Sequence, residues 1–231
     1  MVNPKGSRGI RSIAIVDPGC RVPELGAFNQ MSLMSSVPCS YHLPALFGAS
    51  SMETLEKPLG IVIMGSGASV HETIAWQDHL QQWLWTMIKE KVPILGLCYG
   101  HQLLAHMFGG SIEVASPNKK KFLGVRTIQL DSTTLWGSAR QVQVIVSHRE
   151  TVTKCPEEFE IVGSSPYIAI EALSHKQFPI WSLQSHPEAE EGFIQNQTIP
   201  LPENFSVNEL AGALNLVRQF FVYTADQAKI N

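Results

Sequence analysis

Short apolar runs alternate with longer amphipathic stretches through most of the chain. Apolar runs of five or six residues, which is the length of strands buried on both faces, occupy residues 12–16, 59–64, 92–97 and 180–184. Amphipathic helices are predicted over residues 23–35, 71–91, 102–108 and 210–221. Strands that alternate with helices in this way predict an α/β fold, with a mainly parallel central sheet and helices on both of its faces.

The middle of the chain follows a different pattern. Predicted strands joined by short links, which are typical of hairpins, occupy residues 124–130, 142–146, 160–163 and 168–172, so antiparallel strands are expected there. Residues 43–47 form a run that is too short to assign to helix or strand. Ser206 and Glu209 form a capping-box pattern before the last helix, which is expected over about 206–225. No Pro/Gly/Ser-rich linker divides the chain, so residues 1–231 are expected to form a single domain.

The composition excludes several classes of protein. Hydrophobic residues make up 44% of the 231 residues and charged residues 16%, so the whole chain is neither disordered nor a coiled coil. The net charge of −3 argues against a nucleic-acid-binding module and carries no information about small-molecule substrates. No apolar run approaches the roughly 18 residues of a membrane span, and no signal-peptide pattern follows Met1. The run Lys119-Lys120-Lys121 is interpreted as a solvated loop.

The four cysteines are Cys20, Cys39, Cys98 and Cys155, and no C-x-x-C pair occurs. Such wide spacing predicts reduced thiols in a cytoplasmic protein rather than a disulfide framework. No histidine or cysteine spacing of a metal site is present either, so neither a metal nor a cofactor is expected.

One of these cysteines lies where a buried strand runs directly into a helix. Gly96 and Gly100 flank Cys98 at two residues on either side, which is the pattern of a nucleophile elbow with cysteine in place of serine. Side chains at the two flanking positions would collide across so tight a turn, so glycine is required there. The turn places the thiol at a helix N-terminus, which favours a thiolate, and directs the Tyr99 N–H toward a developing oxyanion.

A cysteine nucleophile needs a base, and the base needs a group that orients it. His186 and Glu188 follow the last predicted strand and suit these two roles, although without Cys98 they would indicate an ordinary polar loop. The stretch Gly65-Ser66-Gly67 ends another predicted strand and can turn a backbone N–H toward the same place. Taken alone, that stretch would be no more than a turn.

Taken together, these stretches resemble the class I, triad-type glutamine amidotransferases. The matches lie in the family's order and at its spacing between about residues 11 and 195, and they are residues 65–66, 96–102, 147–150 and 184–188. The resemblance implies a flavodoxin-like fold in which Cys98 is the nucleophile, His186 the base and acid, and Glu188 the orienting carboxylate. It also implies an oxyanion hole formed by the N–H groups of Tyr99 and Ser66. The glutamine-binding residues that it implies are Gly65, Gly67, Gln102, His148 and Arg149.

The Gly-Ser pair at 65–66 and the tryptophan-bearing segment Ala75-Trp76 resemble a free-standing branch of the family, and the chain departs from the common family pattern at three places. Gly65-Ser66-Gly67 stands where many members have Gly-Gly-Pro, Ser185 where many have an aromatic residue, and Glu150 where Asp is common. That branch includes γ-glutamyl peptidases and proteins similar to the amidotransferase domain of GMP synthetase. The implied activity is hydrolysis of the side-chain amide of glutamine, or of a γ-glutamyl compound, through a cysteine γ-glutamyl thioester. Two alternatives stay open: an ammonia-donating subunit for a separate synthetase, and a non-catalytic binding or sensing protein with the same fold.

Overall fold

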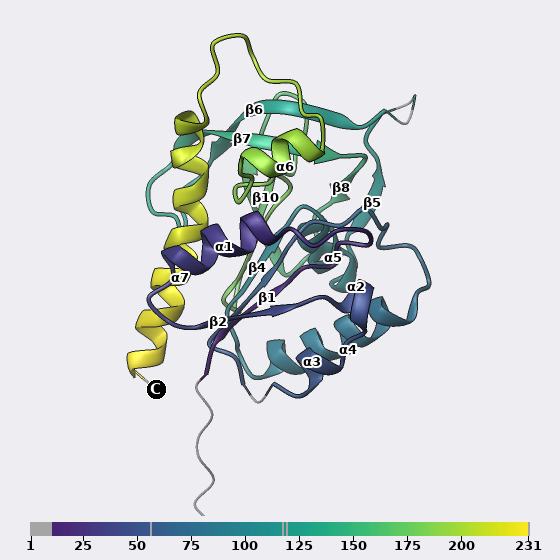
Figure 1. The fold of residues 1–231 in the computed structure, drawn as a ribbon, viewed down its shortest axis with the longest axis vertical. Coiled ribbons are helices and arrows are strands. Elements are labelled where there is room, and N and C mark those ends of the chain that lie inside the picture. Colours follow the sequence, from purple (N-terminus) through teal and green to yellow (C-terminus); the bar gives the residue numbers. More distant parts are fainter. Residues whose placement is uncertain (1–10, 56, 117, 119, 231) are drawn as a thin grey trace, which may run out of the picture.

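The computed structural model describes residues 11–55, 57–116, 118 and 120–230, and Figure 1 shows its fold. Within these residues a nine-stranded sheet runs in the order β2-β1-β3-β4-β11-β10-β9-β6-β7, and β5 pairs with β8 in a separate two-stranded sheet. The first five strands in that order are parallel, and the other four pair in antiparallel fashion. The parallel strands are β1 (Ile13–Val16), β2 (Cys39–His42), β3 (Gly60–Ile63), β4 (Ile94–Leu97) and β11 (Ile180–Leu183). The others are β5 (Ser111–Val114), β6 (Phe122–Leu130), β7 (Arg140–His148), β8 (Glu150–Lys154), β9 (Phe159–Ser164) and β10 (Ala172–His175).

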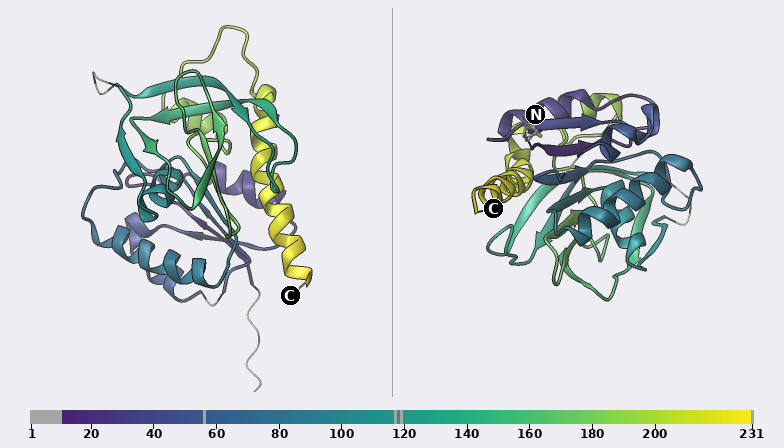
Figure 2. Two further views of the ribbon diagram at one scale, coloured as in Figure 1. Left: turned by 180° about the vertical axis from the view of Figure 1, so that it is seen from behind. Right: turned by 90° about the horizontal axis from the view of Figure 1, so that it is seen from below.

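Helices cover both faces of the parallel strands. They are α1 (Leu25–Met34), α2 (Pro44–Phe47), α3 (Ser50–Glu53), α4 (Ala75–Lys89), α5 (Tyr99–Met107), α6 (Glu191–Asn196), the short 3-10 helix η1 (Val207–Leu210) and α7 (Ala211–Ile230). Ile13 and Ile15 of β1 pack into a cluster with α1 and α7, whereas Ala14 and Val16 pack into a second cluster with α4 and α5. Successive side chains of a strand point to opposite faces, so β1, β3, β4 and β11 each contribute to both clusters. Figure 2 shows α1 and α7 on one side of the sheet and α4 on the other.

The predicted fold class is confirmed, including the antiparallel strands in the middle of the chain. The capping box is also present, because Ser206 accepts from the Asn208 N–H and Glu209 accepts from the Ser206 N–H. It precedes η1, and α7 then continues to Ile230, beyond the expected end.

Three predicted boundaries were wrong. The helix expected over 71–91 is Ala75–Lys89, and the helix expected over 102–108 already begins at Tyr99. The strand expected over 168–172 is Ala172–His175, because Ile168 and Ile170 bury their side chains from a connecting loop. Residues 44–47 form a single helical turn, and β2, β5, β8 and α6 had not been predicted.

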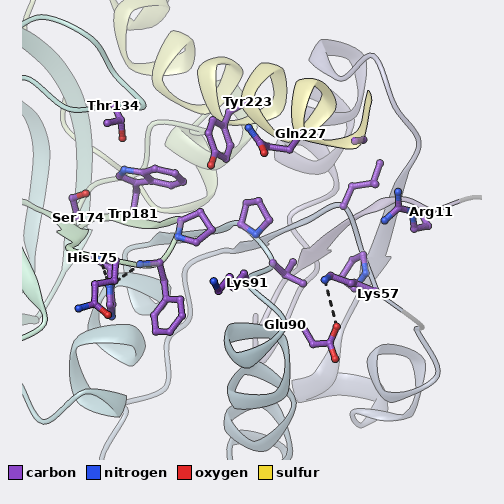
Figure 3. A pocket seen from close by; sticks show the side chains of 18 of the residues that line it. Arg11, Lys57, Glu90, Lys91, Thr134, Ser174, His175, Trp181, Tyr223 and Gln227 are labelled. Carbon is purple, nitrogen blue, oxygen red and sulfur yellow. Dashed lines mark hydrogen bonds and ion pairs between the residues drawn. The ribbon is translucent and has the colours of Figure 1, made fainter. Parts of the chain in front are cut away.

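A pocket of about 580 Å³ opens at the amino ends of β3, β4 and β11 (Figure 3). Lys91, Trp181 and Tyr223 are among the residues that line it, and Lys57 pairs with Glu90 at its edge at 3.4 Å. Cys98 and His186 follow the carboxyl ends of β4 and β11, so this pocket lies at the opposite end of the same strands. In the part of the chain that the structure describes, no helix is both long and apolar enough to cross a membrane.

Candidate active site

Cys98 lies on the elbow between β4 and α5, with backbone angles of φ 50° and ψ −98°. A positive φ in a non-glycine residue costs about 1–3 kcal/mol and persists only where the surroundings enforce it. A Cβ at Gly96 would stand 2.6 Å from the backbone of Gly100, and one at Gly100 would stand 2.5 Å from the Ile63 carbonyl oxygen. The crowding expected from the sequence is therefore present, and it presses the first turn of α5 against β3 and β4.

The Cys98 side chain is buried and approached by donors from two sides. Its own N–H donates to the Leu183 carbonyl at 2.8 Å, which ties the elbow to the end of β11. The side-chain amide of Gln184 lies 3.9 Å from the thiol sulfur. Tyr99 is the first residue of α5, so its N–H has no partner within the helix. The amide and the helix terminus can both stabilise negative charge that develops beside the sulfur.

His186 and Glu188 come together directly after β11. The Nδ1 atom of His186 lies 2.9 Å from Oε1 of Glu188, and both side chains are buried. Because a carboxylate can only accept, Nδ1 carries the proton and Nε2 is left for another partner. A Cβ at Gly65 would lie 2.6 Å from Cε1 of His186 and 3.6 Å from Cβ of Cys98, so the two side chains meet at Gly65. The predicted base, its orienting carboxylate and the thiol therefore share one small site.

The charges around His186 determine its protonation. Burial alone lowers the pKa of the imidazole, because the charged ring loses its hydration. The negative charges of Cys98 and Glu188 outweigh burial and raise the pKa of His186 above its usual value near 6.5, with Cys98 as the larger contributor. Cys98 and Glu188 therefore both favour the protonated form of the His186 ring.

The loop after β3 is held against the same site. Gly65 has no room for a side chain because the His186 ring occupies that space. The hydroxyl of Ser66 donates to the Pro18 carbonyl at 2.7 Å and accepts from the Ala68 N–H at 3.1 Å, which fixes the loop beside the thiol. Gly67 faces open space, since nothing lies within 4 Å of its Cβ position.

Two of the predicted glutamine-binding residues meet at one backbone carbonyl. Nε2 of Gln102 and Nδ1 of His148 both donate to the carbonyl oxygen of Glu150, at 2.7 and 3.0 Å. Gln102 also donates to Oε1 of Gln184 at 3.3 Å, which connects this cluster to the neighbour of the thiol. The side chain of Arg149 is exposed instead, and its carbonyl accepts from the Ala115 N–H. The structure thus brings Gln102 and His148 together and leaves the Arg149 side chain apart.

Two charged residues near the triad, Lys121 and Glu24, belong to none of the motifs found in the sequence. Lys121 is half-buried, donates to Gln197 at 2.9 Å, and interacts electrostatically with Cys98. Of the lysine run expected to be a solvated loop, Lys120 is exposed as expected, Lys121 is not, and Lys119 lies outside the described residues. Burial lowers the pKa of Lys121. Glu24, just before α1, has its pKa raised to about 6 by burial and by the charges of Asp17 and Glu188. Neither residue carries a local signal, so only the tertiary structure reveals them.

All four cysteines are free. Among the described residues, no group of three histidine, cysteine, aspartate or glutamate side chains is arranged to hold a metal ion. The groups that this site offers to a substrate are the thiol, the imidazole and the surrounding N–H groups.

The family model described as "Glutamine amidotransferase class-I" matches residues 35–199 of the chain. The glutamine-hydrolyzing GMP synthase of Phocaeicola vulgatus is 31% identical over 166 residues, which cover 72% of this chain and 31% of that protein. A glutamine-hydrolyzing GMP synthase subunit of Pyrococcus furiosus is 36% identical over 133 residues, 57% of this chain and 67% of that protein. The alignment thus spans about a third of the length of the first relative and two thirds of the second.

Solved structures share the fold at lower identity. A crystal structure of a protein described as a GMP synthase subunit, from Thermoplasma acidophilum, has a TM-score of 0.71 at 20% identity, covering 97% of this chain and 98% of that one. A glutamine amidotransferase from Thermotoga maritima also gives 0.71, at 18% identity and coverages of 93% and 98%. These structures confirm the flavodoxin-like fold. The family match spans well over half of the chain and includes Cys98, His186 and Glu188. The chain therefore belongs to the class I glutamine amidotransferase family.

Proposed function

We propose that the chain hydrolyses the side-chain amide of glutamine, or the amide of a γ-glutamyl compound, with Cys98 as the nucleophile. The observation that carries this proposal is the meeting of Cys98 and His186 at Gly65, with Glu188 on the other side of the imidazole at 2.9 Å from its Nδ1. A strained elbow, a base and an orienting carboxylate together are the arrangement that cysteine acyl transfer requires. Membership of the amidotransferase family supports the same reaction class.

The first half of the reaction transfers the γ-glutamyl group to sulfur. The Cys98 thiolate attacks the amide carbon, a C–S bond forms, and the carbonyl oxygen becomes an oxyanion next to the N–H groups of Tyr99 and Ser66. His186 gives its Nε2 proton to the amide nitrogen as the C–N bond breaks. Ammonia or an amine leaves, and a γ-glutamyl thioester remains.

The second half returns the site to its starting state. Water loses a proton to the now neutral His186 and attacks the thioester carbon. The C–S bond breaks, the acid product leaves as glutamate, and the thiolate and imidazolium are restored. Glu188 keeps the imidazole in one orientation through both halves, because its carboxylate holds Nδ1–H throughout.

The substrate's α-amino and α-carboxylate groups need charged or polar partners at the far end of the site. We assign Lys121 to the carboxylate, because it is a half-buried cation near enough to Cys98 to feel its charge, and its ammonium group donates to Gln197. We assign the remaining polar contacts to Gln102 and the backbone of residues 147–150, where the Glu150 carbonyl accepts hydrogen bonds from both Gln102 and His148. These groups recognise the glutamyl moiety and leave the nature of the leaving amine open.

Glutamate release by the purified protein tests the proposal. Glutamine and a panel of γ-glutamyl peptides are supplied to the wild-type protein and to a Cys98→Ala variant, with Cys155→Ala as the matched control. Cys155 is likewise a free thiol, but it follows β8 away from the triad. We expect release to be lost in Cys98→Ala and retained in Cys155→Ala. Equal release by Cys98→Ala and the wild type would refute the nucleophile assignment.

A second candidate function is ammonia donation to a separate synthetase. Relatives that are themselves named as subunits of GMP synthase favour it, because the alignments cover 64–67% of two such proteins. On this hypothesis, glutamate release is slow in isolation and rises several-fold when an ATP-dependent synthetase from the same organism is added. A fast rate that does not change on such addition would favour independent hydrolysis.

A further inference from the structure

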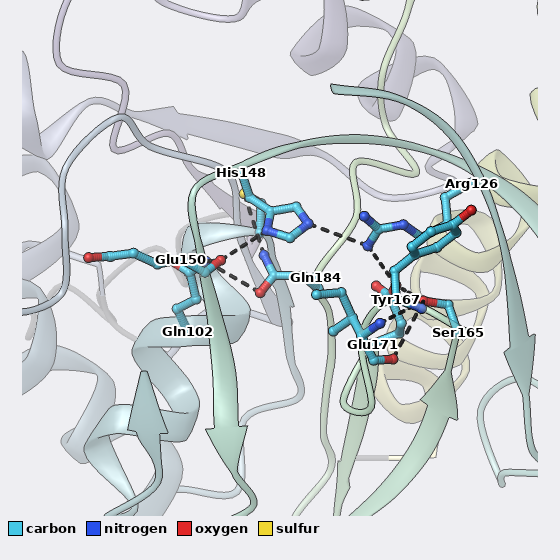
Figure 4. A network of polar contacts seen from close by, with 10 residues as sticks. Gln102, Arg126, His148, Glu150, Ser165, Tyr167, Glu171 and Gln184 are labelled. Carbon is cyan, nitrogen blue, oxygen red and sulfur yellow. Dashed lines mark hydrogen bonds and ion pairs between the residues drawn. The ribbon is translucent and has the colours of Figure 1, made fainter. Parts of the chain in front are cut away.

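A buried ion pair that the proposed mechanism does not use lies beside the glutamine-binding cluster (Figure 4). Arg126 of β6 donates to Oε1 of Glu171 at 2.8 Å, and the two side chains are only 6% and 0% exposed. The Ser165 hydroxyl donates to the same carboxylate oxygen at 2.7 Å. The rings of Phe122 and Tyr167 lie 5.3 and 5.6 Å from the guanidinium carbon. Because burying two charges is costly, such a pair is weak evidence for stability and indicates another role.

The same guanidinium contacts His148. NH1 of Arg126 lies 3.5 Å from Nε2 of the imidazole, and Nδ1 donates to the Glu150 carbonyl at 3.0 Å. A carbonyl can only accept, so the proton of a neutral ring is on Nδ1, and Nε2 presents its lone pair to the arginine. Burial and the charge of Arg126 lower the pKa of His148 to about 3, which keeps the ring neutral. Arg126 therefore selects one tautomer and one orientation of His148.

The contacts continue from His148 to the thiol and then return to Glu171. The Glu150 carbonyl accepts from Gln102 as well as from His148, and Gln102 donates to Gln184. The backbone N–H of Gln184 donates to the carbonyl of Glu171 at 2.8 Å, and its side-chain amide lies 3.9 Å from Cys98. The contacts thus form a closed ring through Arg126, His148, the Glu150 carbonyl, Gln102, Gln184 and Glu171, in which backbone groups link Gln184 to Glu171. The His148 and Gln102 side chains each make two contacts of this ring, so neither can rotate without breaking both.

We propose that Arg126, held in place by Glu171, is a positioning residue that sets the geometry of the glutamine-binding cluster through His148. This inference rests on the function proposed above. Without the guanidinium, the His148 ring can take its other tautomer or rotate, the Glu150 carbonyl loses a donor, and the Gln102 amide is no longer held. Glu188 and the elbow glycines hold the triad directly, and the side-chain contact between this ring and the triad is that of the Gln184 amide with the thiol. Loss of Arg126 therefore weakens substrate binding and spares the reactivity of the thiol.

The experiment removes both charges at once, because either single substitution would leave an unpaired buried charge. The double variant Arg126→Met/Glu171→Met is compared with the wild type in alkylation of Cys98 by a diazoketone analogue of glutamine, which reports binding without turnover. We expect the half-saturating concentration of the analogue, and the KM for glutamine, to rise about tenfold. The rate of alkylation by iodoacetamide and kcat should stay within about twofold, since neither needs the binding cluster.

Two further variants separate positioning from a general structural effect. Arg140→Met removes an arginine of β7 that donates to Trp136 and Gln219 outside the ring of contacts, so it should lower the melting temperature and leave KM unchanged. His148→Asn supplies an amide donor to the Glu150 carbonyl without needing Arg126. When His148→Asn is already present, adding Arg126→Met/Glu171→Met should change the half-saturating concentration of the analogue by less than twofold.

Two results would overturn the inference. An unchanged half-saturating concentration in the double variant would show that the ion pair positions nothing. An undiminished tenfold effect in the His148→Asn background would show that Arg126 acts without His148. If the diazoketone analogue labels the wild type saturably but no glutamate is released from any substrate, the proposed function is refuted and the role of Arg126 in binding is not. If labelling does not saturate, both the proposed function and the role of Arg126 are refuted.

Discussion

Gly96→Ala tests the physical basis of the nucleophile elbow. The new Cβ would stand 2.6 Å from the carbonyl carbon and oxygen of Gly100 and 2.7 Å from a methyl group of Leu104. The Leu104 side chain can rotate away, but the Gly100 backbone belongs to the first turn of α5 and cannot. To restore an ordinary contact of about 3.4 Å, the helix must move by about 0.8 Å relative to β4. Cys98 lies between the two glycines and must move with it.

The size of the effect follows from this displacement. Overpacking of a tight backbone contact costs about 1–3 kcal/mol. For a chain of this length each kcal/mol lowers the melting temperature by about 2–4 °C, so a cost near the middle of that range predicts a fall of about 4–8 °C. A displacement of a catalytic group by about 1 Å costs about 100-fold in rate. The loss of activity should therefore far exceed the loss of stability.

Glutamate release and thermal unfolding, measured on one preparation, test this expectation. Gly212→Ala is the matched control, because its Cβ would meet only a methyl group of Val142 at 3.7 Å and it lies in the first turn of α7. Alanine in a helix is favoured over glycine by up to about 1 kcal/mol, so the control should be slightly stabilised and fully active. A Gly96→Ala variant with wild-type melting temperature and activity would refute the crowding argument.

Further predictions concern strain and charge at the same site. Cys98→Gly should melt about 2–6 °C above Cys98→Ala, because glycine adopts the positive φ of 50° without strain. This relief of strain exceeds the extra backbone entropy that glycine loses on folding. Equal melting temperatures of the two variants would show that the elbow stores no strain. Glu188→Gln removes one of the two charges that raise the pKa of His186, so the imidazole should lose its proton at a lower pH, which an NMR titration of the ring protons measures. For Glu24 the folded-state pKa is raised from 4.5 to about 6, so its stabilising contribution is present below pH 4.5 and is lost as the pH rises through 6. The ionised Glu24 carboxylate therefore destabilises the fold, and Glu24→Gln should stabilise the protein by about 1 kcal/mol, or about 2–4 °C, at pH 8, after a discount for its half-exposed position. The effect should vanish at about pH 3, where both states are protonated.

The elbow and the triad could be predicted because their determinants are local in sequence. The spacing of Gly96, Cys98 and Gly100 lies within five residues, and the crowding at Gly96 comes from the Gly100 backbone four residues away, although Gly100 itself is crowded by the distant Ile63. His186 and Glu188 are separated by a single proline. Parallel strands buried on both faces also produce continuous apolar runs, so β1, β3, β4 and β11 were all found.

The missed strands are those whose burial depends on distant parts of the chain. β2 has the sequence Cys39-Ser40-Tyr41-His42, is mostly half-buried, and lies at the edge of the sheet. Its polar groups are satisfied by tertiary partners, since Nδ1 of His42 contacts the hydroxyl of Ser51 and Tyr41 donates to Asp17. These contacts join the strand to residues outside it and produce no alternation of apolar and polar residues, so the strand could not be predicted from residues 39–42 alone.

The position of Arg126, by contrast, did carry a signal. Along β6 the buried positions are 124, 126, 128 and 130, so the arginine shares the inward face with Ile128 and Leu130. A charged side chain on the inward face of a strand must find an opposite charge or unfold the strand, because an unpaired buried charge costs several kcal/mol. What the sequence could not identify is the partner, because Glu171 lies 45 residues away in a loop segment whose side chains had been expected to form a strand. The alternation of a strand can therefore show that a buried ion pair exists, and only the tertiary fold shows that it contacts the glutamine-binding cluster.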